Sequence, residues 1–181
     1  MYKIQELSHK MFQIVTGRYN NETWDASLHY RTRKNISCIY APPFKLTDTI
    51  DINAPVFVIE MNNTINKIMG IGLIQNKLIT NEIHKVQQDS NCNRYIYIGN
   101  YHISRELLQY YDDFLVDILD EILFKGYTHS KRGGGLTKIP EKVLKLDICQ
   151  GLDIKKQIKN IFCHHFKSKI QKCNPKISCA K

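Results

Sequence analysis

Residues 55–74 read PVFVIEMNNTINKIMGIGLI and carry the clearest β-sheet signal of the chain. Residues 56–61 are rich in β-branched and aromatic side chains, and they lie between Pro55 and an Asn-Asn pair. A second run of this kind, residues 67–74, follows after a short polar turn. The two runs are therefore predicted to form a hairpin whose strands are apolar on both faces, as in a closed barrel or a covered sheet.

The second half of the chain adds two helices with apolar stripes. Ser104 is a favoured N-cap residue, and residues 105–125 carry apolar side chains at helical spacing up to Gly126. Residues 152–169 show the same spacing, with lysines on the opposite face. Both segments are predicted to be amphipathic helices.

The remaining elements give weaker signals. Residues 2–15 have roughly helical spacing and are predicted to form a short helix stopped by Gly17, whereas residues 18–34 follow no regular pattern. Residues 36–40 are typical of a strand. Residues 94–98 and 101–103 are predicted to form a second hairpin around the favoured turn Gly99-Asn100.

These elements predict an α+β fold, a small, partly closed β-barrel flanked by helices, with a basic C-terminal helix. At 181 residues and 43% hydrophobic composition, the chain suits one globular core. We expect residues 1–150 to form the α+β domain. Residues 151–181 are expected to form a basic amphipathic helix and tail that pack on this domain or extend from it.

The charge of the chain is divided unevenly. The net charge is +9, but residues 125–181 contain 14 basic and three acidic side chains, a net +11. Residues 1–124 therefore carry −2. A basic region of this kind predicts a polyanionic partner, with RNA or single-stranded DNA the first expectation and an anionic membrane surface the second.

Other features of the sequence indicate the cellular compartment in which we expect the protein. No run of 18 apolar residues is present, so no membrane span is expected. The first residues lack the apolar stretch of a signal peptide, and the six cysteines form no Cys-x-x-Cys pair. We expect a cytoplasmic protein with reduced thiols, with the nucleus as the other compartment.

The most pointed local motif is the loop that contains Lys131, Arg132, Gly133, Gly134 and Gly135, shortly after His129. Glycines let backbone N–H groups approach an oxyanion, and the two cations add charge and a bidentate fork for phosphate. The spacing is not that of a Walker loop, which argues against nucleotide hydrolysis of that type. The alternative interpretation is a flexible surface loop.

Aromatic side chains are the candidates for base stacking, namely Trp24, Tyr30, Tyr40, Tyr95, Tyr97 and Tyr101. For each tyrosine the alternative is a core residue with a satisfied hydroxyl. Trp24 is the strongest candidate because it lies in a polar segment that no apolar stripe explains. Gly70 and Gly72 face the same side of one strand, which predicts either a close approach by a ligand or a bend in the barrel.

Metal-binding and catalytic patterns are weak. Cys163, His164 and His165 are consecutive and cannot all turn to one ion on a helix, so we predict no metal and no cofactor. Glu60 stands among apolar strand residues, where a carboxylate has a perturbed pKa or pairs with a cation such as Arg94. We predict no catalytic residue. The alternative is a nucleic-acid-processing enzyme, such as a nuclease, that uses Glu60, His129 and Lys131.

Four stretches together resemble the PUA-like superfamily, which includes the ASCH, EVE and YTH domains: residues 55–61, 68–74, 94–98 and 101–104. The chain also resembles uncharacterised proteins of large nucleocytoplasmic DNA viruses. The superfamily resemblance implies a protein that binds RNA or DNA and grips a modified or flipped base in an aromatic pocket. It would give Trp24, Tyr95 and Tyr97 the stacking role, with Asn62 or Asn63 reading a base edge.

The leading hypothesis is a nucleic-acid-binding protein. Its proposed site comprises Trp24, Asn62, Asn63, Tyr95, Tyr97, His129, Lys131, Arg132, Gly133 and Gly134. A third class stays open, in which the chain is a viral structural or interaction protein whose helix at residues 152–169 docks on a protein partner.

Overall fold

The computed structural model describes residue 4 and residues 11–89, 91–127 and 129–173, with side chains described as far as residue 167. Its centre is a mixed five-stranded sheet in the order β6-β4-β3-β1-β7. The strands are β1 (Gln13–Tyr19), β3 (Pro55–Asn62), β4 (Lys67–Gln75), β6 (Tyr101–Ser104) and β7 (Thr137–Lys138). β1 and β3 are parallel, and the other neighbours are antiparallel. The fold is therefore α+β, as predicted, but its sheet does not close into a barrel.

The β3–β4 hairpin confirms the strongest sequence signal. Val56 pairs with Ile74 and Glu60 with Gly70, and the register shifts after Glu60 at a bulge. All eight residues of β3 are buried, because the sheet is covered on both faces. Phe57, Ile59 and Met61 face one core, while Val56 and Val58 face a second core on the other side.

The predicted hairpin around Gly99-Asn100 is wrong. β5 (Tyr97–Gly99) pairs with β2 (Cys38–Tyr40) in a separate two-stranded sheet, whereas β6 pairs with β4. Gly99 lies against the main sheet, since a Cβ atom built on it would be 2.1 Å from the Leu73 carbonyl oxygen. The chain therefore passes from one sheet to the other at this turn instead of folding back on itself.

The prediction for the N-terminal third is also wrong. Residues 13–19 form β1, a strand buried between β3 and β7, and not the end of a helix. The residues expected to be irregular form α1 (Asn21–Lys34), which begins with a capping box between Asn20 and Thr23. Residues 2–3 and 5–10 of the predicted N-terminal helix lie outside the described residues.

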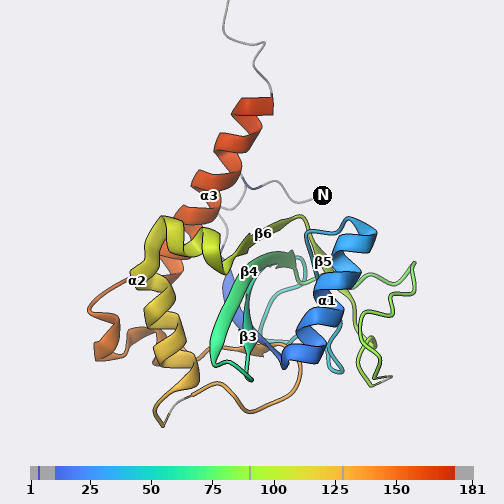
Figure 1. The fold of residues 1–181 in the computed structure, drawn as a ribbon, viewed down its shortest axis with the longest axis horizontal. Coiled ribbons are helices and arrows are strands. Elements are labelled where there is room, and N and C mark those ends of the chain that lie inside the picture. The colour runs from blue at the N-terminus through green and yellow to red at the C-terminus, as the bar shows by residue number, and fades with distance from the viewer. Residues whose placement is uncertain (1–3, 5–10, 90, 128, 174–181) are drawn as a thin grey trace, which may run out of the picture.

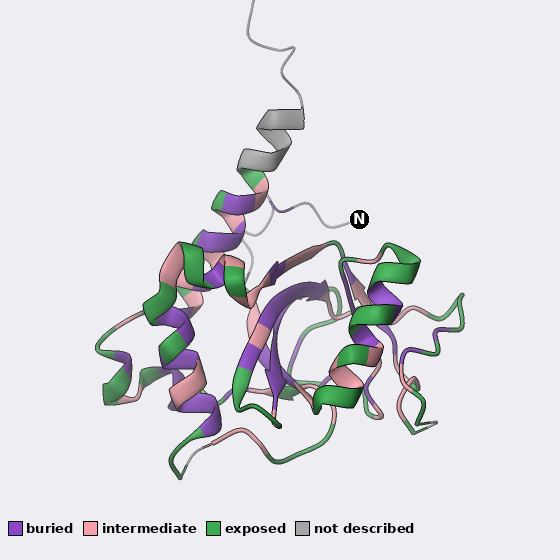
Figure 2. Cartoon of the chain, viewed as in Figure 1, coloured by how far each residue is buried: buried purple, intermediate pink, exposed green. Residues whose placement is uncertain are grey.

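The two predicted C-terminal helices are present and cover one face of the sheet, while α1 lies on the other (Figure 1). α2 (Arg105–Phe124) begins at the Ser104 N-cap and is kinked at Asp112, and α3 (Ile154–Cys173) packs beside it. Short 3-10 turns, η2 (Val143–Lys145) and η3 (Asp147–Cys149), lead into α3. In Figure 2, β3 is buried along its length, whereas α1 and α2 carry both buried and exposed residues.

Candidate functional site

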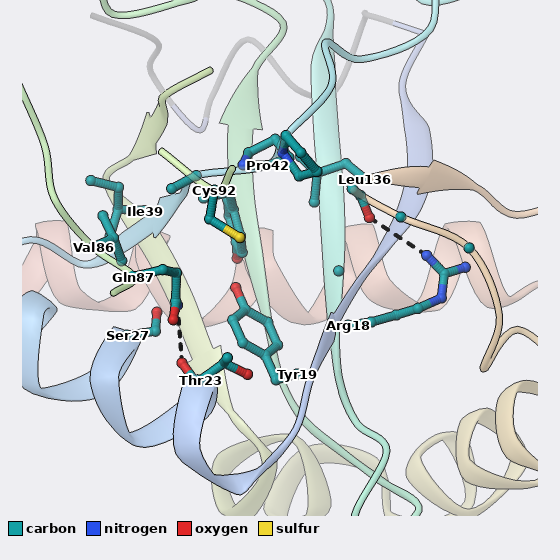
Figure 3. A pocket seen from close by; sticks show the side chains of 17 residues that line it. Arg18, Tyr19, Thr23, Ser27, Ile39, Pro42, Val86, Gln87, Cys92 and Leu136 are labelled. Carbon is teal, nitrogen blue, oxygen red and sulfur yellow. Dashed lines mark hydrogen bonds between the residues drawn. The ribbon is translucent and has the colours of Figure 1, made fainter. Parts of the chain in front are cut away.

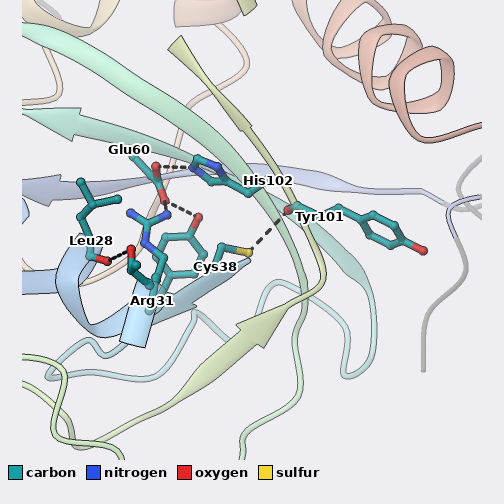
Figure 4. Close-up of polar contacts among 8 residues, drawn as sticks. Leu28, Arg31, Cys38, Glu60, Tyr101 and His102 are labelled. Atoms are coloured by element: carbon teal, nitrogen blue, oxygen red, sulfur yellow. Dashed lines mark hydrogen bonds and ion pairs between the residues drawn. The ribbon is translucent and has the colours of Figure 1, made fainter. Parts of the chain in front are cut away.

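A fully buried carboxylate lies at the middle of the sheet, on the face that α1 covers. Glu60 is 0% exposed. Its Oε1 accepts hydrogen bonds from Arg31 Nη1 at 3.0 Å and from the Tyr40 hydroxyl at 2.9 Å. His102 Nε2 lies 2.8 Å from Oε2, and since an ionised carboxylate only accepts, this nitrogen carries a proton (Figure 4). We call these four residues the carboxylate network.

The two glycines of β4 make the space for this network. A Cβ atom on Gly70 would lie 2.8 Å from His102 Nε2, and one on Gly72 would lie 2.0 Å from the Tyr40 hydroxyl oxygen. The space over Gly70 and Gly72 is therefore filled by side chains of the protein itself, His102 and Tyr40. No external ligand is needed to explain either glycine.

The network shifts the pKa values of Glu60 and Tyr40. Burial raises the pKa of Glu60, but the charges and hydrogen bonds of His102, Arg31 and Tyr40 outweigh burial, so the pKa lies below its usual value. Burial and the Glu60 carboxylate raise the pKa of Tyr40 well above 10. The same two causes raise the pKa of Cys38 to about 12, so this thiol stays protonated and is a poor nucleophile.

A cavity of about 270 Å³ opens beside the network (Figure 3). It lies between the end of β1, the inner face of α1, the segment after β2, residues 86–92 and the loop before β7. The lining residues are Gly17, Arg18, Tyr19, Thr23, Ser27, Ile39, Tyr40, Ala41, Pro42, Pro43, Val86, Gln87, Cys92, Gly133, Gly134, Gly135 and Leu136. Most of the wall is therefore aromatic, aliphatic or proline surface, as is usual for a small-molecule pocket.

One wall of the cavity is the glycine loop, residues 131–135. Arg18 Nε donates to the Ser130 carbonyl oxygen at 2.5 Å, and Arg18 Nη1 donates to Thr137 Oγ1 at 3.0 Å. Asn63 Nδ2 donates to the Lys131 carbonyl oxygen at 3.0 Å. These contacts join the residues at both ends of the loop to the sheet.

The opposite wall is fixed as firmly. The Asn93 side chain accepts hydrogen bonds from the backbone N–H groups of Val86 and Gln87. Gln87 Nε2 donates to the Thr23 carbonyl oxygen at 3.0 Å, which ties this wall to α1 (Figure 3). The cavity therefore lies between two braced walls.

The structure does not bring the three predicted stacking residues into the cavity. Trp24 is half-buried on α1, where its ring packs edge-on against Tyr19 and lies 4.9 Å from the Arg31 guanidinium carbon. Tyr97 is 1% exposed and its hydroxyl accepts the backbone N–H of Leu46, so its ring cannot stack on a ligand. Tyr95 is half-buried beside Lys45, outside the cavity lining.

The other predicted residues divide between structural and exposed positions. Asn62 is buried and bonds to Asn21 Oδ1 and the backbone N–H of Thr64, and Asn63 holds the glycine loop, so both amides have structural partners. His129 accepts from the Lys131 backbone. Gly133 and Gly134 line the cavity, Lys131 is half-buried beside them and Arg132 is exposed.

The cations of α3 lie far from this site, because α3 packs on the opposite face of the sheet. Among the described residues, the α3 lysines and the glycine loop therefore do not gather around one cleft, and Lys131 and Arg132 lie on the loop that forms one wall of the cavity. The enzyme alternative placed Glu60, His129 and Lys131 in one site. In the structure, the hydrogen bonds of the Glu60 carboxylate go to Arg31, Tyr40 and His102 instead.

Sequence reasoning missed Arg31, His102 and Ser27 as site residues and suggested Arg94 as the partner of Glu60. The one available signal was the pair of glycines on the strand next to Glu60, since removing two side chains makes room for others. Nothing in the sequence tells which distant side chains fill that room.

No family model, curated protein or solved structure matches this chain. Within the described residues, no helix has the length and apolar character needed to cross a bilayer. The same part of the chain holds no group of three or more histidine, cysteine, aspartate or glutamate side chains arranged to bind a metal ion.

Proposed function

We propose that the protein binds single-stranded nucleic acid, RNA or DNA, with one base in the cavity and the adjoining phosphates on the glycine loop. The observation that carries this proposal is the position of the loop. The segment with the phosphate-binding composition is also a wall of the largely apolar cavity.

The size of the cavity suits a single ring. Its volume of about 270 Å³ is just below the usual range for drug-sized ligands, which favours a single base over a whole nucleotide. Tyr19, Pro42 and Leu136 supply apolar walls. A splayed base gains about 1–3 kcal/mol from stacking on such an aromatic surface.

The rim next to this cavity suits a phosphate chain. Gly133 and Gly135 have φ of +110° and +68°, values that side-chain-bearing residues rarely adopt. A backbone free of Cβ atoms lets its N–H groups approach an anion, and Lys131 and Arg132 add positive charge beside it. Kinship with the PUA-like superfamily, whose members grip a base in a pocket, belongs to the same proposal.

The experiment measures the affinity of fluorescein-labelled single-stranded octanucleotides by anisotropy over a salt series. The wild-type logarithmic affinity should fall by roughly 0.7 per neutralised phosphate for each log unit of salt. Replacing Lys131 and Arg132 together by Ala should weaken binding and flatten this slope. The matched control replaces Lys156 and Lys167, two exposed lysines on α3, and should leave both nearly unchanged.

Two results would remove the proposal. One is an affinity that does not change between low and physiological salt. The other is a larger loss from the α3 pair than from the glycine-loop pair, which would move binding to the opposite face of the sheet.

A further inference from the structure

The described lining of the cavity contains a single charged side chain, Arg18 of β1. No ion pair between described residues includes this arginine. Burial lowers the pKa of Arg18, as expected of a partly buried cation without a negative neighbour, but a guanidinium group stays charged at physiological pH. The cavity wall therefore carries a positive charge that no described side chain neutralises.

One nitrogen of the Arg18 guanidinium is available to a ligand. Nε donates to the Ser130 carbonyl oxygen, and Nη1 donates to Thr137 Oγ1 and, at 3.5 Å, to the Gly135 carbonyl oxygen. All three acceptors are neutral. Among the described residues Nη2 has no hydrogen-bond partner, and it is not one of their fully buried unpaired atoms, so solvent reaches it. Its two N–H groups can bind an acceptor from outside the chain.

This free nitrogen lies beside the glycine loop. Figure 3 shows the guanidinium next to the loop at the wall of the cavity. A Cβ atom built on Gly133 would lie 3.7 Å from Arg18 Cζ, Nη1 and Nη2. A group that rests on the Gly133 backbone is therefore also close to Nη2.

The charge around this position favours an anion. No described lining residue is acidic, and Lys131 and Arg132 on the loop add two more cations. The buried Glu60 carboxylate already accepts hydrogen bonds within the carboxylate network, so its charge is compensated there. A neutral ligand oxygen would leave the cations uncompensated, whereas a phosphate both accepts from a guanidinium and offsets its charge.

We infer that Arg18 Nη2 binds a phosphate oxygen of the nucleotide whose base occupies the cavity. This inference rests on the proposed function and deepens it, because it gives one phosphate a direct ligand on the central sheet in addition to the loop. The ligand recognised here is then a nucleotide unit, a base with its adjoining phosphate.

The experiment repeats the salt series with the fluorescein-labelled octanucleotide that the wild type binds most tightly. Arg18→Gln should weaken binding about tenfold or more at low salt, because it removes a charged hydrogen bond. It should also reduce the slope of logarithmic affinity against logarithmic salt by about 0.7, the value for one phosphate on a single strand. Arg18→Lys keeps the charge and should restore most of this slope.

The slope separates phosphate binding from a role in holding the loop. Asn63→Ala is the matched control, since it removes another hydrogen bond to the loop but no charge, and it should weaken binding without changing the slope. If Arg18 only held the loop, Arg18→Gln would behave in the same way. An unchanged slope in Arg18→Gln, or no recovery of the slope in Arg18→Lys, would overturn the inference and leave the proposed function in place.

Failure of the proposed function gives a different result. If no octanucleotide binds, nucleic-acid binding is refuted, and inorganic phosphate is then titrated into ¹⁵N-labelled wild-type protein at constant ionic strength. A shift of the Arg18 side-chain Nε–H signal with phosphate, but not with chloride, would support phosphate binding by Arg18. The absence of this shift would refute the inference as well.

Discussion

Gly72→Ala tests whether the glycines of β4 exist to house the carboxylate network. The new Cβ atom would lie 2.0 Å from the Tyr40 hydroxyl oxygen and 3.0 Å from Cys38 Sγ, so Tyr40 must leave its place against Glu60. The lost hydrogen bond to a charged group costs about 1.5–3 kcal/mol, and overpacking adds about 1–3 kcal/mol. We expect the free energy of unfolding to fall by about 3–5 kcal/mol in urea titrations followed by circular dichroism.

Two comparisons make this prediction specific. In Gly17→Ala, on the neighbouring β1, the closest contact of the new Cβ atom is the flexible end of Leu136 at 3.2 Å, and Val58 Cγ1 follows at 3.5 Å, so the cost should be less than about 1 kcal/mol. In a Tyr40→Phe background the clashing hydroxyl is gone, so Gly72→Ala should cost about 1–2 kcal/mol less than it does in the wild type. Equal costs for the two glycines, or the same Gly72→Ala cost in both backgrounds, would refute the reasoning.

Three further predictions follow from the same contacts. The pKa of Glu60 in the folded protein lies below 4.5, so its carboxylate stabilises the fold above pH 4.5, and this stabilisation is lost as the pH falls through the folded pKa. Glu60→Gln should therefore flatten the acidic part of a pH–stability curve measured by urea titration. Iodoacetamide should modify Cys92, which lines the cavity, well before the buried Cys38, and a bound oligonucleotide should slow the reaction at Cys92 in peptide mass spectra. Asn63→Ala should free the glycine loop, which faster amide hydrogen exchange at Gly133 and Gly134 would show, and should weaken oligonucleotide binding about fivefold or more.

The elements that the sequence predicted well are those whose burial follows a simple period. The β3–β4 hairpin is continuous apolar sequence, and the stripes of α2 and α3 end inside the core, for example at Ile158 and Phe162. The buried stripe of α3 also affects how the interaction-protein alternative can be tested. Deleting residues 152–169 would remove core side chains as well as an exposed surface, so a loss of partner binding in that deletion would not show that the helix itself docks on the partner.

Two elements that the sequence misassigned, α1 and β1, contribute side chains to the site. The inner face of α1 buries Ser27, Tyr30 and Arg31, which gives no apolar stripe to recognise as a helix. β1 is central in its sheet, so apolar side chains point to both faces and the alternation that marks a half-buried strand is lost. The inner face of α1 is polar because Ser27 lines the cavity and Arg31 bonds to Glu60 in the carboxylate network.

The site itself depends on contacts between distant residues. Glu60 meets partners 20, 29 and 42 positions away along the chain, and no local pattern records those distances. The net charge of the C-terminal region gave a wrong expectation, that its cations gather around one cleft, for the same reason. Counting cations along the sequence does not reveal that α3 lies across the sheet from the glycine loop.

The most direct test of nucleic-acid binding in the cavity is a titration of ¹⁵N-labelled protein with unlabelled octauridylate, followed by amide chemical shifts. The account predicts the largest changes at Tyr19, Ser27 and residues 133–135, with small changes along α3. Changes concentrated at the α3 lysines, with the cavity signals unmoved, would contradict it.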